Sequence, residues 1–300
     1  MKTTRWIVVL ALLGGMFAVT SLHAAKVKVV ALNIEWFPGQ KWTPEPEDME
    51  RHMGETAETL RALAPEILVA TEICDADAFR TVLRAVPGLN LRVISNFTGS
   101  EEDSERRNQQ IALATMLPTI AGWAEPWKAT VDGLRRGFSF AAIENPFTGR
   151  LIMLYGLHLK SNLSNTPEEE QMNYDIRDES VRQLLVHADQ MAEQFAARGI
   201  DGWIIAGDIN TNHDGKFGDR VVEMFVEAGY WNTWEGVPPE ERQTWKGRHE
   251  RFEPSTLDYI FLKGLGQPQA SMIWVDETVS DHNAVVVEIE LPGAFDHADD

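Results

Sequence analysis

The stretch WIIAGDIN, residues 203–210, decides how the rest of the chain is interpreted. Its apolar first half predicts a buried strand, and Asp208 and Asn210 follow where that strand ends. A strand holds its last side chain rigidly, and clefts form at strand ends. Gly207 permits close backbone approach at this point. Gly, Asp and Asn are also common in ordinary turns, so this stretch indicates a functional site only in combination with similar stretches elsewhere in the chain.

Two earlier segments also carry oxygen-bearing side chains on apolar strands. In VVALNIEW, residues 29–36, Asn33 and Glu35 fall on one face by the two-residue period of a strand. In PEILVATE, residues 65–72, four apolar residues precede Glu72 at the predicted strand end. Carboxylate and amide oxygens suit a hard cation such as Mg²⁺. These segments therefore predict part of a cation site, although each alone is also compatible with a polar strand edge.

Three later segments add imidazole, amine and carboxylate groups. In LYGLHLKSN, residues 154–162, the alternating His158, Lys160 and Asn162 can line one face and stabilise charge on a phosphoryl group. Asp258 interrupts the apolar run LDYIF, residues 257–261, and a buried carboxylate requires a partner. The SDHN segment, residues 280–283, offers His282 as that partner, and Asp281 can then contact a metal. A Ser/His/Asp hydrolase built on the serine of this segment is disfavoured, because no G-x-S-x-G elbow is present.

The order of apolar runs predicts an α+β fold. Several strand-like runs follow one another directly, and a doubly wound parallel sheet would need more regular alternation with helices. We expect two packed sheets covered by helices in a single domain over residues 26–291, since neither repeat nor linker is visible. Helical patterns cover residues 47–63, 75–86, 167–197 and 216–228, and Thr166 with Glu169 forms a capping box for the third.

The two ends of the chain predict export and a frayed tail. Lys2 and Arg5 precede an apolar run over residues 6–19 and small residues up to 25, which is typical of a signal peptide over residues 1–25. An anchor helix is the alternative, but the run is shorter than the roughly 20 residues of a membrane span. Cys74 is the only cysteine, so a bacterial periplasmic or secreted location fits better than a disulfide-stapled module. Residues 292–300 are expected to form an acidic tail.

The charge balance limits the kind of substrate. The net charge is −19, and removing residues 1–25 takes away two basic residues, which gives 25 − 46 = −21. This argues against general charge-driven binding of nucleic acid, but it allows a phosphate held locally with a metal. The candidate phosphate contacts are Lys160, Asn162, Arg107, Arg136 and Arg177, and for the three arginines solvated surface charge is an equally good explanation.

Other aromatic and histidine residues are interpreted as structural. Packing is favoured over a base-stacking surface for the three tryptophans that precede the Asp258 strand, namely Trp231, Trp234 and Trp245. Four histidines are interpreted as non-catalytic: His52, His187, His213 and His249. Of these, only His213 follows a candidate site residue, Asn210, closely enough to be reconsidered.

Taken in order, these motifs resemble the endonuclease/exonuclease/phosphatase superfamily, also called deoxyribonuclease I-like, from about residue 27 to residue 291. The resemblance implies a four-layer α/β sandwich of two mainly antiparallel sheets flanked by helices. It implies that Asn33 and Glu72 hold Mg²⁺ or Mn²⁺ with Asp281 close by, and that Glu35 occupies a position that is acidic in some members.

The resemblance also implies roles for the remaining residues. His158 would donate to the phosphoryl oxygens, and Asp208 and Asn210 would lie at the attacking water. Asp258 would orient His282, and either His282 or Asp208 would take the proton from water. The expected activity is metal-dependent hydrolysis of a phosphate ester by a monomeric, exported nuclease-type phosphodiesterase, with DNA or RNA among its substrates. A phosphodiesterase or phosphatase for lipid headgroups or small esters is the alternative, and a non-catalytic binding module on the same scaffold is the third interpretation.

Overall fold

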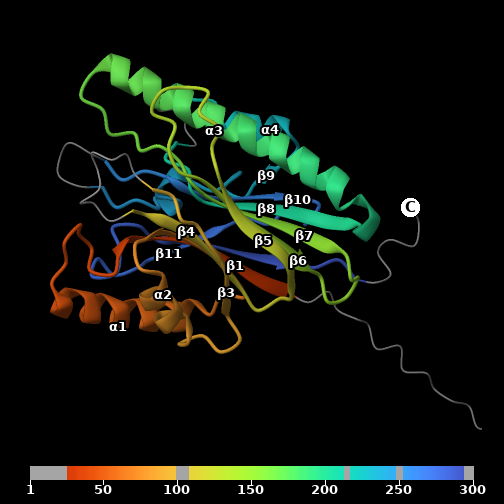
Figure 1. The fold of residues 1–300 in the computed structure, drawn as a ribbon, viewed down its shortest axis with the longest axis horizontal. Helices are drawn as coiled ribbons and strands as arrows, with labels where there is room; N and C mark the ends of the chain where they lie inside the picture. The colour runs from red at the N-terminus through yellow and green to blue at the C-terminus, as the bar shows by residue number, and fades with distance from the viewer. Residues whose placement is uncertain (1–25, 99–107, 213–216, 248–252, 294–300) are drawn as a thin grey trace, which may run out of the picture.

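The computed structural model describes residues 26–98, 108–212, 217–247 and 253–293. Two six-stranded sheets pack face to face, and helices cover the outer face of each sheet (Figure 1). Neighbouring strands are antiparallel except for one parallel pair in each sheet. The predicted four-layer sandwich of two mainly antiparallel sheets is therefore confirmed.

The first sheet has the order β11-β12-β1-β2-β4-β3. Its strands are β11 (Ser271–Ile273), β12 (Ala284–Glu290), β1 (Lys26–Phe37), β2 (Ile67–Ile73), β4 (Gln110–Thr115) and β3 (Asn90–Ile94). Alternate residues of β1 serve two cores: Val27, Val29 and Ala31 pack between the sheets, and Val30 and Leu32 pack under the helices. The two-residue period therefore directs the odd-numbered side chains of this strand toward the second sheet.

The second sheet has the order β5-β6-β7-β8-β10-β9. Its strands are β5 (Thr119–Pro126), β6 (Gly137–Glu144), β7 (Leu151–His158), β8 (Ile200–Asp208), β10 (Asp258–Lys263) and β9 (Trp231–Asn232). The central strands β7 and β8 are almost wholly buried, which agrees with their continuous apolar runs. The weak strands β5, β9 and β11 were not expected: β5 is a half-exposed edge, and the other two span only two and three residues.

Helices α1 (Pro46–Leu63) and α2 (Ala76–Leu83) cover the first sheet, and α3 (Pro167–Gln194) and α4 (Val221–Glu227) cover the second (Figure 1). Short 3₁₀ turns lie at Ala196–Arg198 and Pro239–Glu241. Thr166 caps α3 as predicted, but the Glu169 carboxylate accepts from Asn165 N instead of from the capping residue. The prediction that α4 begins at residue 216 is wrong, because the Asp219 carboxylate turns inward and the helix starts after it.

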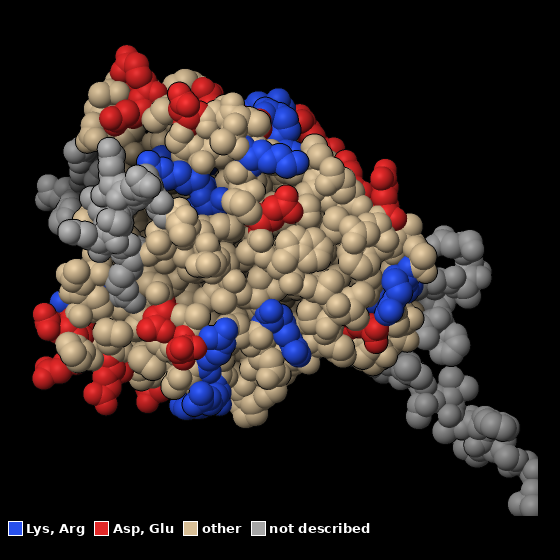
Figure 2. Space-filling view, viewed as in Figure 1, with Lys and Arg blue, Asp and Glu red and all other residues tan. Residues whose placement is uncertain are grey.

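The chain ends are placed only in part. The predicted signal peptide, residues 1–25, and residues 294–300 lie outside the described residues. Pro292 O accepts a 2.9 Å hydrogen bond from the Asn145 side chain, so this end of the predicted tail is attached to the folded domain. No helix within the described ranges is long and apolar enough to cross a membrane. Figure 2 shows acidic side chains gathered along the edges formed by the outer helices, with basic side chains scattered between them.

Candidate active site

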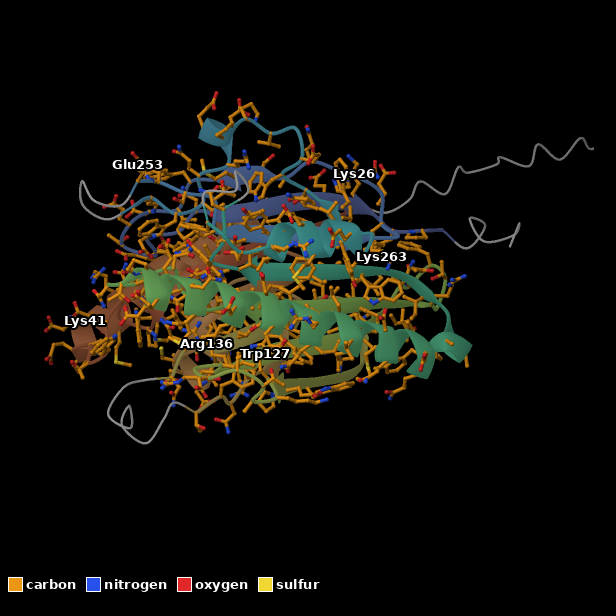
Figure 3. The ribbon with its side chains drawn as sticks, turned by 90° about the horizontal axis from the view of Figure 1, so that it is seen from above. Lys26, Lys41, Trp127, Arg136, Glu253 and Lys263 are labelled. Carbon is orange, nitrogen blue, oxygen red and sulfur yellow. The ribbon has the colours of Figure 1, made fainter. Side chains whose placement is uncertain are left out.

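A pocket of about 810 Å³ opens at one end of the sandwich and is lined by both sheets. Figure 3 shows the lining residue Glu253 near the end of the molecule opposite Lys26 and Lys263, the first residue of β1 and the last residue of β10. Nine of the predicted site residues line this pocket: Glu35, Glu72, Arg136, His158, Asn162, Asp208, Asn210, Asp281 and His282.

Strand register explains why residues distant in sequence meet here. Asp208 at the end of β8 pairs with His158 at the end of β7 on one side and with Asp258 at the start of β10 on the other. Gly207 adopts φ +133, and a Cβ atom there would lie 2.1 Å from Leu157 O. Only glycine fits at this position, so the strands can approach each other closely just before the polar residues.

Asn33 joins the two sheets through the pocket-lining residues Glu72 and Asp208. Its Nδ2 donates to Glu72 Oε1 at 3.1 Å and to Asp208 Oδ2 at 3.0 Å, while its Oδ1 accepts from Glu35 N at 3.1 Å. The second oxygen of Glu72 accepts from Trp36 N at 3.0 Å. Both Trp36 and Glu72 have positive φ angles, 49° and 63°, which are uncommon for such residues and cluster at functional sites. Asn33 therefore orients two carboxylates as well as offering an oxygen of its own.

Asp258 and His282 form a buried pair. Asp258 Oδ2 lies 2.6 Å from His282 Nδ1, and Asp258 is fully buried. His282 Nε2 then points toward Asp208 Oδ2 at 4.0 Å and Asp281 Oδ1 at 3.9 Å. Burial by itself lowers the pKa of His282, but the Asp258 carboxylate and the other nearby carboxylates raise it above the usual value. The imidazole is thus held in one orientation and in its charged form.

Asp208 and His158, at the same end, also have pKa values shifted by burial. Burial raises the pKa of Asp208, and the adjacent Asp258 carboxylate raises it further. Burial lowers the pKa of His158 well below its usual value, and the Arg136 and His282 charges act in the same direction. His158 Nε2 lies 3.7 Å from Asp208 Oδ2 and 3.9 Å from Glu72 Oε1. A neutral His158 beside a basic Asp208 is suited to hydrogen bonding and proton transfer near neutral pH.

Arg136 lies on the wall beside His158. It donates from Nη1 to His158 O at 3.3 Å and Leu159 O at 3.1 Å, and from Nη2 to Gln109 Oε1 at 2.6 Å. Among the described lining residues it is the only Lys or Arg. Asn162 lies nearby and donates to Asn210 O, while Asn210 N donates to Asp208 Oδ1 at 3.0 Å. These bonds fix the loops that follow β7 and β8.

Three predicted substrate contacts are not part of the described pocket wall. Arg177 is fully buried and paired with Asp219, so its prediction as a phosphate contact is wrong. The helical periodicity of α3 turns this residue inward, where a guanidinium needs a buried carboxylate. Lys160 is half-buried and is not among the lining residues. Strand β7 ends at His158, so the two-residue period that would place Lys160 on the same face does not extend to it. Arg107 lies outside the described residues.

Sequence reasoning missed the role of Trp245. Its indole Nε1 donates to Asp281 Oδ2 at 3.0 Å, and its ring lines the pocket. Trp231 and Trp234 instead pack and donate to backbone carbonyls, in agreement with the packing interpretation. Nothing in the local sequence separates the three, since only the backbone bridges of Trp245 to Ser255 and His282 bring it to the site.

Ser280 is a structural link and not a nucleophile. Its Oγ donates to Asn33 O at 2.7 Å and accepts from His282 N at 2.9 Å. The serine is fully buried, which agrees with the low weight given to a Ser/His/Asp hydrolase.

The donor set fits a divalent cation. Six carboxylates line the pocket, from Glu35, Glu72, Glu170, Asp208, Glu253 and Asp281, whereas Arg136 is the only Lys or Arg among the described lining residues. Burial raises the pKa of Glu72, which is the expected result for a carboxylate without a full counter-charge. The trio Asp208, Asp258 and His282 also offers ligand atoms within 4.8 Å of one another. Asp258 and His282 are already bonded to each other at 2.6 Å, so we favour the Glu72–Asp281 side for a cation.

Comparison with known proteins supports the fold. The model of the endonuclease/exonuclease/phosphatase family matches residues 30–282. An endonuclease/exonuclease/phosphatase from Beutenbergia cavernae is similar with a TM-score of 0.65 at 20% identity, over 90% of this chain and 72% of that one. Truncated Caenorhabditis elegans TDP2 gives 0.60 at 17%, over 90% and 99%. The human nocturnin catalytic domain with bound sulfate gives 0.62 at 17%, over 89% and 95%. No curated protein matches.

Proposed function

This chain belongs to the endonuclease/exonuclease/phosphatase family, and from that premise we propose that it is a phosphodiesterase that uses Mg²⁺ or Mn²⁺ and in-line attack by water. The family comprises hydrolases that act on phosphate esters. The observation that supports the proposal best is the arrangement around Asn33, which donates hydrogen bonds to two carboxylates. One is Glu72, a proposed cation ligand, and the other is Asp208, the proposed proton acceptor. A single phosphoryl group in the pocket would contact both sides.

Glu72 and Asp281 would hold the cation, with the Asn33 and Glu35 oxygens beside them. The cation would polarise a phosphoryl oxygen and offset the charge that develops on it. Trp245 holds Asp281 through its indole, and Trp36 N holds Glu72 through its backbone. These partners fix the ligand orientation, which is how outer hydrogen bonds support a metal site.

Asp208 is proposed as the group that accepts the proton from the attacking water. Its raised pKa keeps the carboxylate basic near neutrality, and its hydrogen bonds to Asn33 and Asn210 N fix its direction. His282 is a poorer proton acceptor, because its raised pKa keeps the imidazole protonated and charged. It is therefore better suited to donate a hydrogen bond to the phosphoryl group than to remove a proton.

The remaining lining residues complete a set of donors. His158, neutral because of its lowered pKa, can donate to a phosphoryl oxygen without adding charge. Arg136, Asn162 and Asn210 also line the pocket and would position the ester. Each donor acts on oxygens that gain charge during the reaction, which is the condition for lowering the barrier.

The substrate is proposed from the size and charge of the pocket. A nuclease-type activity on DNA or RNA is the first candidate. A small phosphate ester or lipid headgroup is the second, since Arg136 is the only Lys or Arg among the described lining residues and the net charge is −19. A polyanion generally requires several phosphate contacts. We further propose that residues 1–25 direct export to the periplasm or medium, and that the protein is a monomer.

The test is a hydrolysis panel with matched variants. Purified protein with Mg²⁺ is assayed on plasmid DNA, RNA, bis-p-nitrophenyl phosphate and sphingomyelin, with EDTA as the metal control. We expect hydrolysis of at least one substrate, lost with EDTA and in Asp208→Ala and His282→Ala, but retained in Asp189→Ala on the exposed face of α3. Near wild-type turnover by either site variant, or silence on every substrate, would contradict the proposal; silence would favour a binding module.

A further inference from the structure

We propose that His52, a residue of α1 outside the pocket wall, is a positioning residue that ties together the two turns holding Glu35, Asp281 and His282. His52 is fully buried, at the start of the buried face of α1. Its ring packs edge-on against Phe37, with ring centroids 5.3 Å apart. The proposal rests on the proposed function for its activity readout, but two of its measurements do not depend on hydrolysis.

Both ring nitrogens of His52 are bonded to the backbone of other segments. Gly39 N donates to Nδ1 at 2.7 Å, and Nε2 lies 2.7 Å from Val279 O. A backbone N–H can only donate, so Nδ1 is the acceptor and the proton lies on Nε2, which donates to Val279 O. One imidazole thus joins a turn 13 residues away in sequence to another 227 residues away.

The first turn follows β1 and controls Glu35. Gly39 has φ +104, and a Cβ atom there would lie 2.3 Å from Pro44 Cβ, so the turn has a single tight path. The next residue, Gln40, donates from Nε2 to Glu35 Oε2 at 3.2 Å and to Glu277 O at 2.7 Å. A shift of Gly39 would therefore move Gln40, and with it one of the bonds that hold the Glu35 carboxylate.

The second turn precedes β12 and controls Asp281 and His282. Val279 is directly followed by Ser280, whose Oγ donates to Asn33 O at 2.7 Å and accepts from His282 N at 2.9 Å. Asp281 N donates to Glu35 Oε2 at 3.2 Å. Glu35 therefore accepts hydrogen bonds from both turns, and His52 also links the two turns to each other.

An apolar residue of the same size would fill the core equally well, so packing alone does not explain a histidine here. Gly39 and Val279 are both buried, and removing the imidazole nitrogens would leave one N–H and one C=O without these bonds. Buried backbone groups without partners are costly, and the turns would be expected to move in order to regain them. Movement of about 1 Å at a site can lower the rate ~10²-fold.

The experiment compares three variants of His52 in the full chain. His52→Phe keeps the ring and loses both bonds, whereas the amide oxygen of His52→Asn imitates Nδ1 and the amide nitrogen of His52→Gln imitates Nε2. We expect kcat to fall ~10²-fold in the Phe variant with KM nearly unchanged. The Gln variant should recover more of the lost kcat than the Asn variant, because it keeps the hydrogen bond to Val279 O, which lies next to residues 280–282.

Two further readouts are independent of turnover. Calorimetric Mn²⁺ binding should weaken ~10-fold in the Phe variant. Hydrogen exchange should rise in residues 37–44 and 274–283. The matched control is His187→Phe, which loses a buried 3.0 Å hydrogen bond to Tyr155 Oη. Neither of these two residues lines the pocket, so kcat and Mn²⁺ binding should be unchanged.

The outcomes separate the two proposals. If wild-type protein hydrolyses nothing, the proposed function fails, while Mn²⁺ binding and hydrogen exchange still decide the role of His52. The positioning role is overturned by a folded Phe variant with wild-type exchange and Mn²⁺ affinity. If the Phe variant does not fold, the Asn and Gln variants decide: wild-type values in both overturn the proposal, and graded losses with Gln above Asn support it.

Discussion

Replacing Arg177 with methionine tests whether the ion pair beneath α3 stabilises the domain. Arg177 is fully buried and donates from Nε to Asp219 Oδ2 at 3.0 Å, from Nη2 to the same oxygen, and from Nη1 to Lys160 O at 3.0 Å. The Asp219 side chain is 1% exposed. Arg177→Met therefore leaves a carboxylate out of water without its counter-charge, although Thr211 Oγ1 still donates to it.

The expected cost follows from that buried charge. Removing one partner of a buried pair destabilises by roughly 3–5 kcal/mol, whereas the pair itself adds little over apolar residues of similar volume. The free energy of unfolding of such domains is only about 5–15 kcal/mol. The melting temperature should therefore fall by roughly 6–20 °C, at about 2–4 °C per kcal/mol. The double variant Arg177→Met/Asp219→Leu should recover most of the loss.

The assay is urea unfolding followed by tryptophan fluorescence, since the chain has ten tryptophans. A lower midpoint with an unchanged m value reports stability alone. Arg182→Met is the matched control on the same helix, because its pair with Glu179 has an arginine side chain that is 61% exposed. Exposed pairs contribute about 0–1 kcal/mol. A loss below about 1 kcal/mol in Arg177→Met, or no recovery in the double variant, would refute the reasoning.

Three further predictions concern the pocket. Asp258→Asn should lower kcat by ~10²–10⁴-fold with the fold retained, because His282 loses the carboxylate that orients and charges it; steady-state kinetics and circular dichroism check this. Trp245→Phe removes the indole bond to Asp281 and should weaken Mn²⁺ binding ~10-fold in calorimetry, and unchanged affinity would count against it. Mn²⁺ at 100 times its Kd should stabilise the protein by about 2.7 kcal/mol, and Glu72→Gln should reduce the resulting shift in melting temperature.

The sequence by itself determined most of the element types and nine of the residues that line the pocket. Two-residue hydrophobic periods and polar residues at strand ends are local patterns, so they can be recognised from the sequence without knowing which residues are neighbours in space. For that reason Asp208, Asn210 and His158 could be selected from their own segments alone. Boundaries and weak edge strands were less certain, because a strand such as β5 is defined by pairing and not by composition.

The tertiary structure alone decided the partners of each polar group. Whether Arg177 faces solvent or a buried carboxylate depends on the loop that carries Asp219, 42 residues away. Trp245 and His52 acquire their contacts with the site segments through backbone groups of distant turns, which no side-chain pattern encodes. Hydrogen bonds and pKa shifts depend on distance and burial in three dimensions, so chain position can nominate a residue without fixing what it touches.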